Sequence, residues 1–303
     1  MKPCLGITMG DPLGIGPEII LKALPKYRAQ IDFRVFGDSR LLAGLPPEEL
    51  IEITQLPSQP APSAREAGAA AVAYLEAAME AHARGEIQGL VTAPISKAHV
   101  QLAGFPFPGH TEYLAAKTGT EKFAMMMAGD KLRVTLVTIH RPLVEIPSSI
   151  TLTNILKTIE ITYQSLKNLF GIAKPRVAVC ALNPHAGEGG LLGTEEKKVI
   201  APAIAAAREK GYACEGPRVP DAVFYEAYRG QWDAVVCMYH DQGLIPFKMI
   251  HFQDGVNVTL GLPLVRTSPD HGTAFDIAGK GLAESTSMES AIELAIDLVK
   301  RKT

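Results

Sequence analysis

Residues 233–243 read DAVVCMYHDQG, a short apolar run that stops at a histidine and an aspartate. Short apolar runs rich in β-branched residues are typical of buried strands. Two further runs end in a similar way: LRVTLVTIH (132–140) ends on His140, and RVAVCALNPH (176–185) reaches His185 just past its apolar part. Each of the three strand-like runs is therefore followed at its C-terminal end by a histidine, and these are His140, His185 and His240.

The rest of the chain alternates between strand-like and helix-like runs. PCLGITMG (3–10) and GLVTAP (89–94) are strand-like, whereas TLTNILKTIEITYQSLKNLFG (151–171) has apolar residues at helical spacing. Another helix is predicted over 63–85, because Ser63 and Glu66 have capping-box spacing and Gly85 can end the helix. This alternation predicts an α/β protein with mostly parallel strands.

The chain has 303 residues, of which 47% are hydrophobic. At roughly 150 residues per domain, this length favours two domains. We expect the first to comprise residues 1–127 and 263–303, and the second residues 128–262. The last segment, 263–303, is expected to fold back on the first domain, because segments rich in candidate functional residues occur both before and after the middle of the chain.

Composition argues against several classes of protein. The net charge is −2, with 30 basic and 32 acidic residues, and only 6% of residues are aromatic; a nucleic-acid-binding surface would need clustered basic residues or interleaved aromatics. We find neither a signal-peptide layout nor an apolar run of the roughly 18 residues that span a membrane. The four scattered cysteines form no C-x-x-C motif and are expected to be reduced core thiols of a cytoplasmic protein.

The three strand-end histidines are candidate metal ligands. Open α/β sheets bind ligands beyond the carboxyl ends of their strands. Imidazoles suit Zn²⁺ and related borderline metals, and three protein ligands with one open position are typical of catalytic sites. The alternative is that His140, His185 and His240 are hydrogen-bonded structural residues.

A glycine-rich stretch, TMGDPLGIGPE (8–18), joins a strand to a helix. Gly14 and Gly16 fit the start of a dinucleotide-binding fingerprint, and Asp38 lies roughly where its acidic residue falls, but Ile19 stands where the third glycine should be. A phosphate-binding P-loop also fails, since no Gly-Lys-Ser/Thr follows. The stretch is either a tight turn or a backbone site for a ligand or for domain packing.

Candidate anion-binding residues occur in two further stretches. In FPGHTEY (107–113), Thr111 could cap a helix, or together with His110 and the helix N-terminus it could hold an anion. In 246–276, Lys248, Asn257 and Arg266 flank a strand-like run, and two cations with an amide suit a phosphate or carboxylate. The alternative for each of these is an ordinary surface residue.

Other polar residues complete the candidates. The loop NPHAGEGGLLGTEE (183–196) is too rich in glycine for a plain connector and is expected to face a ligand. SPDHGTAFD (268–276) adds Asp270, His271, Thr273 and Asp276 before a helix. Lys97 ends another strand and is a candidate acid or base, with a solvated lysine as the alternative.

Five of these motifs, taken together, closely resemble one enzyme family. They are GDPLGIGPE (10–18), PGHTE (108–112), NPHAGEGG (183–190), YHDQGL (239–244) and VNVTLGLPLVRTSPDHGTAFDIAGKG (256–281). The chain resembles the 4-hydroxythreonine-4-phosphate dehydrogenases of vitamin B6 biosynthesis from about residue 5 to its end. The family pattern implies two α/β/α domains with a cleft between them, similar to isocitrate and isopropylmalate dehydrogenases, and a homodimer.

The resemblance also implies roles for individual residues. A divalent metal (zinc, magnesium or cobalt) would be held by His140, His185 and His240, shared between the two subunits. NAD or NADP would bind without the usual fingerprint, which would account for Ile19. The residues expected to contact the substrate are His110, Thr111, Lys248, Asn257 and Arg266.

The implied reaction is oxidation of 4-phosphooxy-L-threonine at C3 by NAD, followed by decarboxylation to 3-amino-2-oxopropyl phosphate. By position alone, Asp241 and Lys97 are the candidate bases. The nearest alternative is a relative that oxidises a four-carbon sugar-acid phosphate, namely D-threonate or D-erythronate 4-phosphate. An acyltransferase such as phosphate acetyltransferase would leave the three histidines unexplained, and a solute-binding protein would need an export signal.

Overall fold

The computed structural model describes residues 2–57 and 61–302, which form two compact units. The first ends at Gly119 and resumes over Leu262–Arg301, and the second is Thr120–Gly261. The sequence predicts this boundary at 127, eight residues later than Gly119. The difference arises because residues 124–128 form a strand that pairs with strands of the second unit.

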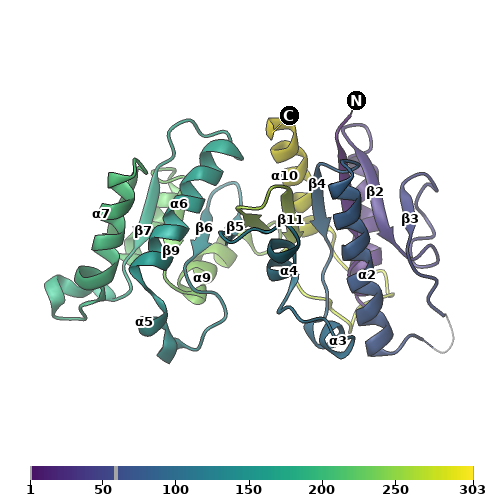
Figure 1. The fold of residues 1–303 in the computed structure, drawn as a ribbon, viewed down its shortest axis with the longest axis horizontal. Coiled ribbons are helices and arrows are strands. Elements are labelled where there is room, and N and C mark those ends of the chain that lie inside the picture. The colour runs from purple at the N-terminus through teal and green to yellow at the C-terminus, as the bar shows by residue number, and fades with distance from the viewer. Residues whose placement is uncertain (1, 58–60, 303) are drawn as a thin grey trace. The chain divides into compact units, whose positions relative to one another are not determined.

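The first unit contains a parallel sheet with the strand order β3-β2-β1-β4-β11 (Figure 1). Its strands are β1 (Cys4–Thr8), β2 (Asp32–Gly37), β3 (Leu50–Glu52), β4 (Gly89–Thr92) and β11 (Val265–Pro269). Its helices are α1 (Gly16–Ala23), η1 (Leu24–Lys26), α2 (Ala64–Ala83), α3 (Lys97–Leu102), α4 (His110–Lys117) and α10 (Thr286–Lys302). From β1 the chain passes to β2 on one side and later reaches β4 on the other, so the strand order reverses between β1 and β4.

Helix α2 confirms the capping box that the sequence predicted. The Ser63 hydroxyl accepts a hydrogen bond from the Glu66 amide at 3.3 Å, and the Ser63 amide donates to the Glu66 carboxylate at 2.7 Å. The alanine-rich face of α2 packs against β1 and β2. At Gly68 a Cβ atom would lie 2.0 Å from the carbonyl oxygen of His99, so the close approach of α3 requires a glycine there.

The second unit has the strand order β10-β5-β6-β9-β7-β8. Its strands are β5 (Ala124–Ala128), β6 (Arg133–Leu136), β7 (Val177–Cys180), β8 (Cys214–Arg218), β9 (Ala234–Cys237) and β10 (Val256–Leu260). Its helical segments are η2 (Leu143–Glu145), α5 (Ile146–Ser149), α6 (Leu152–Asn168), η3 (Pro184–Gly190), η4 (Glu196–Ile200), α7 (Ala201–Glu209), α8 (Pro220–Tyr228) and α9 (His240–His251).

Strands β6, β9, β7 and β8 pair in parallel, as predicted, whereas β5 is antiparallel to both β6 and β10. The strand-like run over 256–265 proved to be two strands, β10 and β11. Between them Gly261 adopts φ +90°, a conformation that favours glycine, and Pro263 follows. The break assigns β10 to the second unit and β11 to the first.

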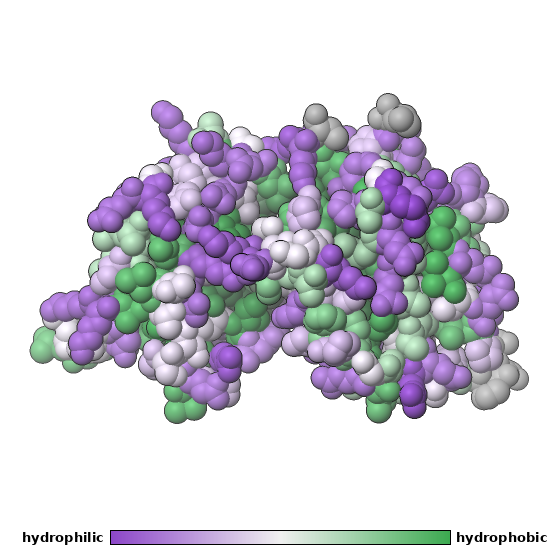
Figure 2. Space-filling model, viewed as in Figure 1, coloured by the Kyte–Doolittle hydropathy of each residue, from purple (hydrophilic) through white to green (hydrophobic). Residues whose placement is uncertain are grey.

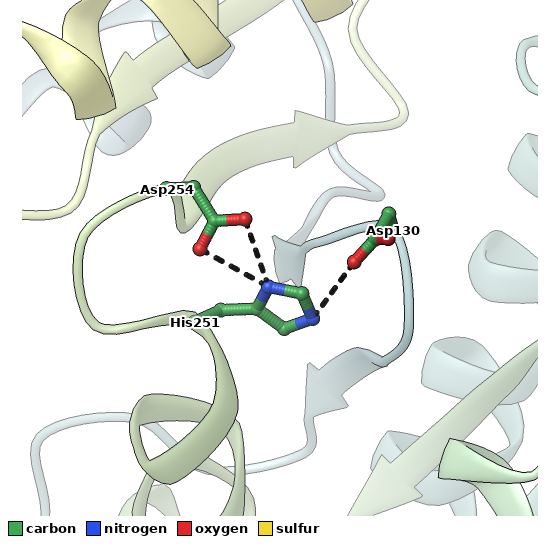
Figure 3. Close-up of side chains that lie close together, drawn as sticks. All are labelled: Asp130, His251 and Asp254. Carbon is green, nitrogen blue, oxygen red and sulfur yellow. Dashed lines mark hydrogen bonds and ion pairs between the residues drawn. The ribbon is translucent and has the colours of Figure 1, made fainter.

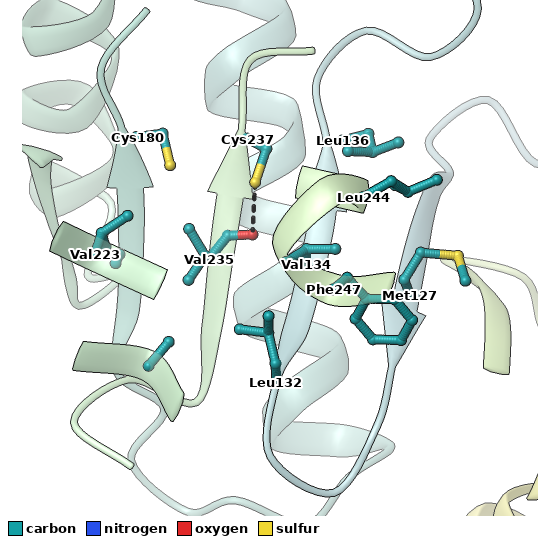
Figure 4. Packing of buried hydrophobic residues seen from close by; sticks show 12 residues of the cluster. Met127, Leu132, Val134, Leu136, Cys180, Val223, Val235, Cys237, Leu244 and Phe247 are labelled. Carbon is teal, nitrogen blue, oxygen red and sulfur yellow. Dashed lines mark hydrogen bonds between the residues drawn. The ribbon is translucent and has the colours of Figure 1, made fainter. Parts of the chain in front are cut away.

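One hydrophobic cluster of the second unit lies between its sheet and helices α8 and α9 (Figure 4). Leu244 and Phe247 of α9 pack over Val134 and Leu136 of β6, and Phe247 is completely buried. Burial of one such side chain contributes about 1.5–3 kcal/mol to folding. The buried Cys237 belongs to the same cluster, and burial raises its pKa well above the ordinary value, as suits a core thiol.

Within the described residues, no helix is both long enough and apolar enough to cross a lipid bilayer. On the face that Figure 2 shows, hydrophilic side chains predominate and the hydrophobic ones form separate patches.

Candidate active site

The three strands that precede the candidate histidines are neighbours in one sheet. β9 lies between β6 and β7 and is parallel to both, so the carboxyl ends of all three lie at one edge. His140 follows β6 by four residues, His240 is the first residue of α9 just after β9, and His185 lies in η3 after β7. All three histidines therefore follow the carboxyl ends of adjacent parallel strands.

His140 and His240 lie side by side at this edge. Their ring centroids are 5.6 Å apart, with the ring planes inclined by 40°. Two imidazoles at this separation can direct one nitrogen each at a single ion, given metal–nitrogen distances of roughly 2.0–2.1 Å. The Asp241 carboxylate lies 2.7 Å from Nδ1 of His240, which leaves Nε2 as the available ligand atom. Carboxylates commonly orient metal-binding imidazoles in this way.

His185 is not brought into the same cluster. In the part of the chain that the structure describes, the ligand atoms of His140, His185 and His240 do not all lie within 4.8 Å of one another. His185 is exposed and sits in a turn with left-handed backbone geometry, at φ 51° and ψ 31°. One chain therefore assembles two of the three predicted ligands.

A different histidine, His251, lies between two carboxylates (Figure 3). Its Nδ1 is 3.2 Å from both carboxylate oxygens of Asp254, and its Nε2 is 3.6 Å from Asp130. Nε2 also accepts a hydrogen bond from the Lys131 amide at 3.3 Å, so both ring nitrogens are engaged. The ring is 2% exposed and packs against Gly129, where a Cβ atom would come within 2.4 Å of it. We interpret this group as a structural link between the β5–β6 turn and the end of α9.

Replacing His251 with alanine is expected to lower the free energy of unfolding by about 2 kcal/mol, since two hydrogen bonds of about 0.5–1.5 kcal/mol each are lost with the ring. Asp130→Asn, at an exposed side chain, is expected to change it by less than about 0.5 kcal/mol. Urea denaturation measures both effects. If added Zn²⁺ or Co²⁺ stabilised the native protein but not the His251→Ala variant, the structural interpretation would be wrong.

The first unit holds a buried cation whose side chain reaches the carboxyl end of β4. Arg266 of β11 is 3% exposed, and its Nη2 donates to the Thr92 hydroxyl at 2.6 Å. Burial lowers the pKa of Arg266 to about 10, while the nearby Glu112 acts to raise it. His110 is the first residue of α4, and its pKa is held well below the ordinary value, first by burial and then by the charge of Arg266. A buried guanidinium and a helix N-terminus together favour an anion.

Thr111 lies in the first turn of α4, and the N-cap residue is Gly109. The interpretation of Thr111 as an N-cap is therefore wrong, and its hydroxyl is part of the same helix end as His110.

The pKa of His110 makes a pH dependence testable. The unfolded chain, with a histidine pKa near 6.5, binds this proton more readily than the folded chain, so stability falls as the pH drops below that value. The loss is at most about 1.4 kcal/mol for each pH unit. His110→Asn should remove this part of the acid sensitivity, so the stability advantage of the wild type over the variant should shrink between about pH 7.5 and about pH 5.5. A constant difference in urea denaturation across that range would contradict the assignment.

Two more predicted residues lie in the second unit. Asn257 of β10 is opposite Met127 of β5, and its buried Oδ1 has no hydrogen-bond partner within the described residues. A buried acceptor without a partner costs about 1–3 kcal/mol, so such an atom calls for an explanation, and a ligand is one. Lys248 is partly buried near the C-terminal end of α9.

The two candidate bases are both exposed. Asp241 already bonds His240, and Lys97 is the first residue of α3 in the other unit.

A pair that the sequence did not single out links the loop after β1 to helix α3. The Asp11 carboxylate is fully buried and lies 2.7 Å from Nδ1 of His99, whose ring stacks on Phe275 with centroids 5.0 Å apart. The glycine-rich stretch around Asp11 is indeed a tight turn: a Cβ at Gly16 would lie 2.1 Å from the carbonyl oxygen of Met9. An acidic residue within a glycine-rich turn, Asp11, was the sequence signal for this pair, but its partner His99 lies 88 residues away.

Gln242 was also missed. It is 8% exposed, accepts from the Met238 amide at 2.7 Å and donates to the Ala181 carbonyl at 2.8 Å. An amide can donate and accept at once, and this one ties the end of β9 to the end of β7. Gln242 therefore fixes the edge from which His240 and the loop of His185 extend.

Comparison with known proteins identifies the family. The model of the pyridoxal phosphate biosynthetic protein PdxA matches residues 17–295. The chain belongs to the PdxA family. A 4-hydroxythreonine-4-phosphate dehydrogenase from Desulfosudis oleivorans is 50% identical to the chain, covering 98% of the chain and 96% of the relative. The crystal structure of the Klebsiella pneumoniae 4-hydroxythreonine-4-phosphate dehydrogenase matches with a TM-score of 0.88 and 39% identity, covering 99% of the chain and all of that protein.

These matches confirm the predicted resemblance, and the PdxA-family chain is a dehydrogenase. The predicted fold class is also confirmed, since the isocitrate dehydrogenase of Methylococcus capsulatus matches with a TM-score of 0.52 over 99% of the chain; at 15% identity this likeness concerns the fold alone. A relative from Oceanobacillus iheyensis, named "Putative D-threonate 4-phosphate dehydrogenase", is 42% identical over 99% of both chains.

Proposed function

We propose that the protein oxidises 4-phosphooxy-L-threonine at C3 with NAD or NADP and a divalent metal, and that decarboxylation then gives 3-amino-2-oxopropyl phosphate for pyridoxal phosphate biosynthesis. The observation that carries this proposal is the His140–His240 pair at the carboxyl edge of neighbouring strands, in a chain of the PdxA family. The function of an acyltransferase or of a solute-binding protein would leave this histidine pair unexplained.

The metal ligands in this proposal are His140, His185 and His240. Their nitrogens suit Zn²⁺, Co²⁺ or, less closely, Mg²⁺. When bound, the ion would stabilise negative charge that develops on the C3 oxygen of the substrate. The hydrogen bond that Nδ1–H of His240 donates to the Asp241 carboxylate holds the His240 ring in the orientation that keeps Nε2 available.

Each unit by itself offers residues that suit an anionic group of the substrate. In the first unit, His110, Thr111 and Arg266 offer a helix N-terminus and a buried guanidinium. In the second unit, Lys248 offers an ammonium group and Asn257 a buried amide. Of the two candidate bases, we favour Lys97, because Asp241 is already hydrogen-bonded to His240.

The dinucleotide would bind at the carboxyl ends of β1 and β4. Ligands of open α/β sheets bind where the strand order reverses, and in the first unit this occurs between those two strands. The Asp11–His99 pair links the loop after β1 to α3, and the Ile15 amide donates to the Thr273 carbonyl at 3.0 Å, which adds the loop after β11. The glycines allow these segments to pack closely, since a Cβ atom at Gly10 would lie 2.4 Å from the carbonyl oxygen of Pro94 and one at Gly14 would lie 2.9 Å from that of Thr273.

We further propose a homodimer of cytoplasmic subunits. Helix α9 and its C-cap residue expose an apolar stripe of Ile245, Met249 and Phe252, with exposed fractions of 60%, 83% and 77%. Their spacing places them on one face of the helix, and Leu143 and Val144 of η2 are similarly exposed. Apolar side chains grouped in this way commonly mark a protein interface, and a second copy is the commonest partner.

Mixing inactive subunits tests the shared site. If one ligand comes from the partner subunit, a variant at that ligand and a variant at either other ligand should complement each other. Random mixing of two such variants restores about a quarter of the sites, by the statistics of a twofold dimer. All three pairings of His140→Ala, His185→Ala and His240→Ala should be assayed. Two pairings should recover activity, and the ligand they share is the one supplied in trans. Confirmed heterodimers that never recover activity would contradict the shared site.

Substrate comparison tests the function. We expect 4-phosphooxy-L-threonine to give a higher kcat/KM than D-threonate 4-phosphate or D-erythronate 4-phosphate, which carry a hydroxyl in place of the amine at C2. The Oceanobacillus relative makes the sugar-acid phosphates the specific alternative. A higher kcat/KM for either of them would replace the proposed substrate with that alternative.

A further inference from the structure

The loop that carries His185 has an unusual backbone. Five consecutive residues, 185–189, have positive φ angles of 51°, 54°, 74°, 40° and 68°. Three of them, His185, Ala186 and Glu188, are not glycines. A left-handed conformation costs an L-residue roughly 1–2 kcal/mol, so the surrounding structure must hold this turn in place.

A buried carboxylate provides that support. Glu196 of η4 is 4% exposed. Its Oε1 accepts hydrogen bonds from the amides of Leu182 and Asn183 at 2.9 and 2.8 Å, and its Oε2 accepts from Nδ2 of Asn183 at 3.1 Å. A buried carboxylate is costly unless it is fully hydrogen-bonded, and this one is bonded to the residues immediately before His185.

Two glycines allow the loop to close around this carboxylate. A Cβ atom at Gly187 would lie 2.6 Å from Oε2 of Glu196, and one at Gly193 would lie 2.3 Å from Nδ2 of Asn183. The same Nδ2 donates to Glu195 at 2.8 Å. Glu196 thus contacts the chain both before and after His185, which explains why the stretch needs its glycines.

We propose that Glu196 is a positioning residue that holds the left-handed turn and so presents the His185 imidazole to the metal. This inference rests on the proposed role of His185 as a metal ligand. A carboxylate suits the task because it only accepts hydrogen bonds, and all its partners here are N–H donors. A glutamine would turn an NH₂ group toward one of those donors.

The test is the affinity for Co²⁺, whose visible spectrum reports binding without turnover. Glu196→Gln is expected to weaken Co²⁺ binding about 10- to 100-fold, as changes behind a metal ligand typically do. At saturating Co²⁺ the variant should regain most of its kcat. The matched control is Glu209→Gln, at an exposed carboxylate on α7, which should bind Co²⁺ like the wild type. His185→Ala is the reference for loss of the ligand itself.

The outcomes distinguish the positioning role of Glu196 from the role of His185 as a metal ligand. If His185→Ala weakens binding but Glu196→Gln does not, the role of Glu196 is refuted and the metal site stands. If His185→Ala binds Co²⁺ normally, the proposed metal site is itself wrong. Should Glu196→Gln fail to fold, Asn183→Ala removes the side-chain donor and leaves two backbone donors on the carboxylate. That variant should then bind Co²⁺ about tenfold more weakly, and unchanged binding would refute the proposal.

Discussion

Replacing His240 with alanine is expected to lower kcat by about 10³-fold while leaving the fold intact. A metal that stabilises developing charge contributes several kcal/mol to the transition state, and each 1.36 kcal/mol is worth a factor of about ten. His240 is only partly buried and begins a helix, so its loss should cost little stability. His140→Ala is expected to behave in the same way, because its ring lies 5.6 Å from that of His240.

Metal content and circular dichroism should accompany these rate measurements. His82→Ala is a suitable control, since His82 lies on α2 and bonds the carbonyl oxygen of Ile87. The effect of Asp241→Asn should lie between those of His240→Ala and His82→Ala, with metal affinity lowered about 10- to 100-fold. A His240→Ala enzyme that kept both its metal and its kcat would show that this edge of the sheet is not the metal site.

The second large effect is expected at the substrate's charged groups. Lys248→Ala should raise KM about 10- to 150-fold, since loss of a charge-assisted hydrogen bond costs roughly 1.5–3 kcal/mol. Arg266 is buried, so Arg266→Lys is the more useful change: it keeps the charge and removes the planar, forked donor. The exposed Lys210, at the end of α7, provides a control as Lys210→Ala.

Comparison with a substrate that lacks the phosphate identifies which group is bound. With 4-hydroxy-L-threonine, the wild type should lose most of its advantage over the Lys248 and Arg266 variants, because the interaction that they lack is then absent from both. If variants and wild type lose activity equally when the phosphate is removed, these side chains do not bind phosphate.

Local sequence patterns were enough to predict several helices and strands and the edge of the sheet at which the histidines lie. The capping box at Ser63 and Glu66 placed α2, and three β-branched runs ending in histidine placed β6, β7 and β9. Because these strands are parallel, their carboxyl ends lie at one edge of the sheet, whereas the order β6-β9-β7 is known only from the structure. These features depend on residues close in sequence, or on a rule that holds for a whole class of sheets.

Other features depend on contacts that no local pattern contains. Helix α9 begins at His240 itself, although its apolar residues and Pro246 resemble an extended segment, because Leu244 and Phe247 pack onto the sheet. Strand β5 reads AMMMA, without the β-branched residues that mark strands. The buried Arg266 donates a hydrogen bond to Thr92, which lies 174 residues away in the sequence.

The geometry of His185 is a similar case. Its left-handed turn is held by Glu196, which follows it by eleven residues and reads in the sequence as part of a helix. The glycines around it indicated a ligand-facing loop but not the carboxylate that the loop encloses.

The measurement that most directly tests the central claim is the rate of NADH formation from 4-phosphooxy-L-threonine, with and without a metal chelator. The proposed function predicts formation of NADH by the native protein, loss of that activity after chelation, and its return when Zn²⁺, Co²⁺ or Mg²⁺ is added back. Full activity in protein shown to be free of metal would contradict the central claim.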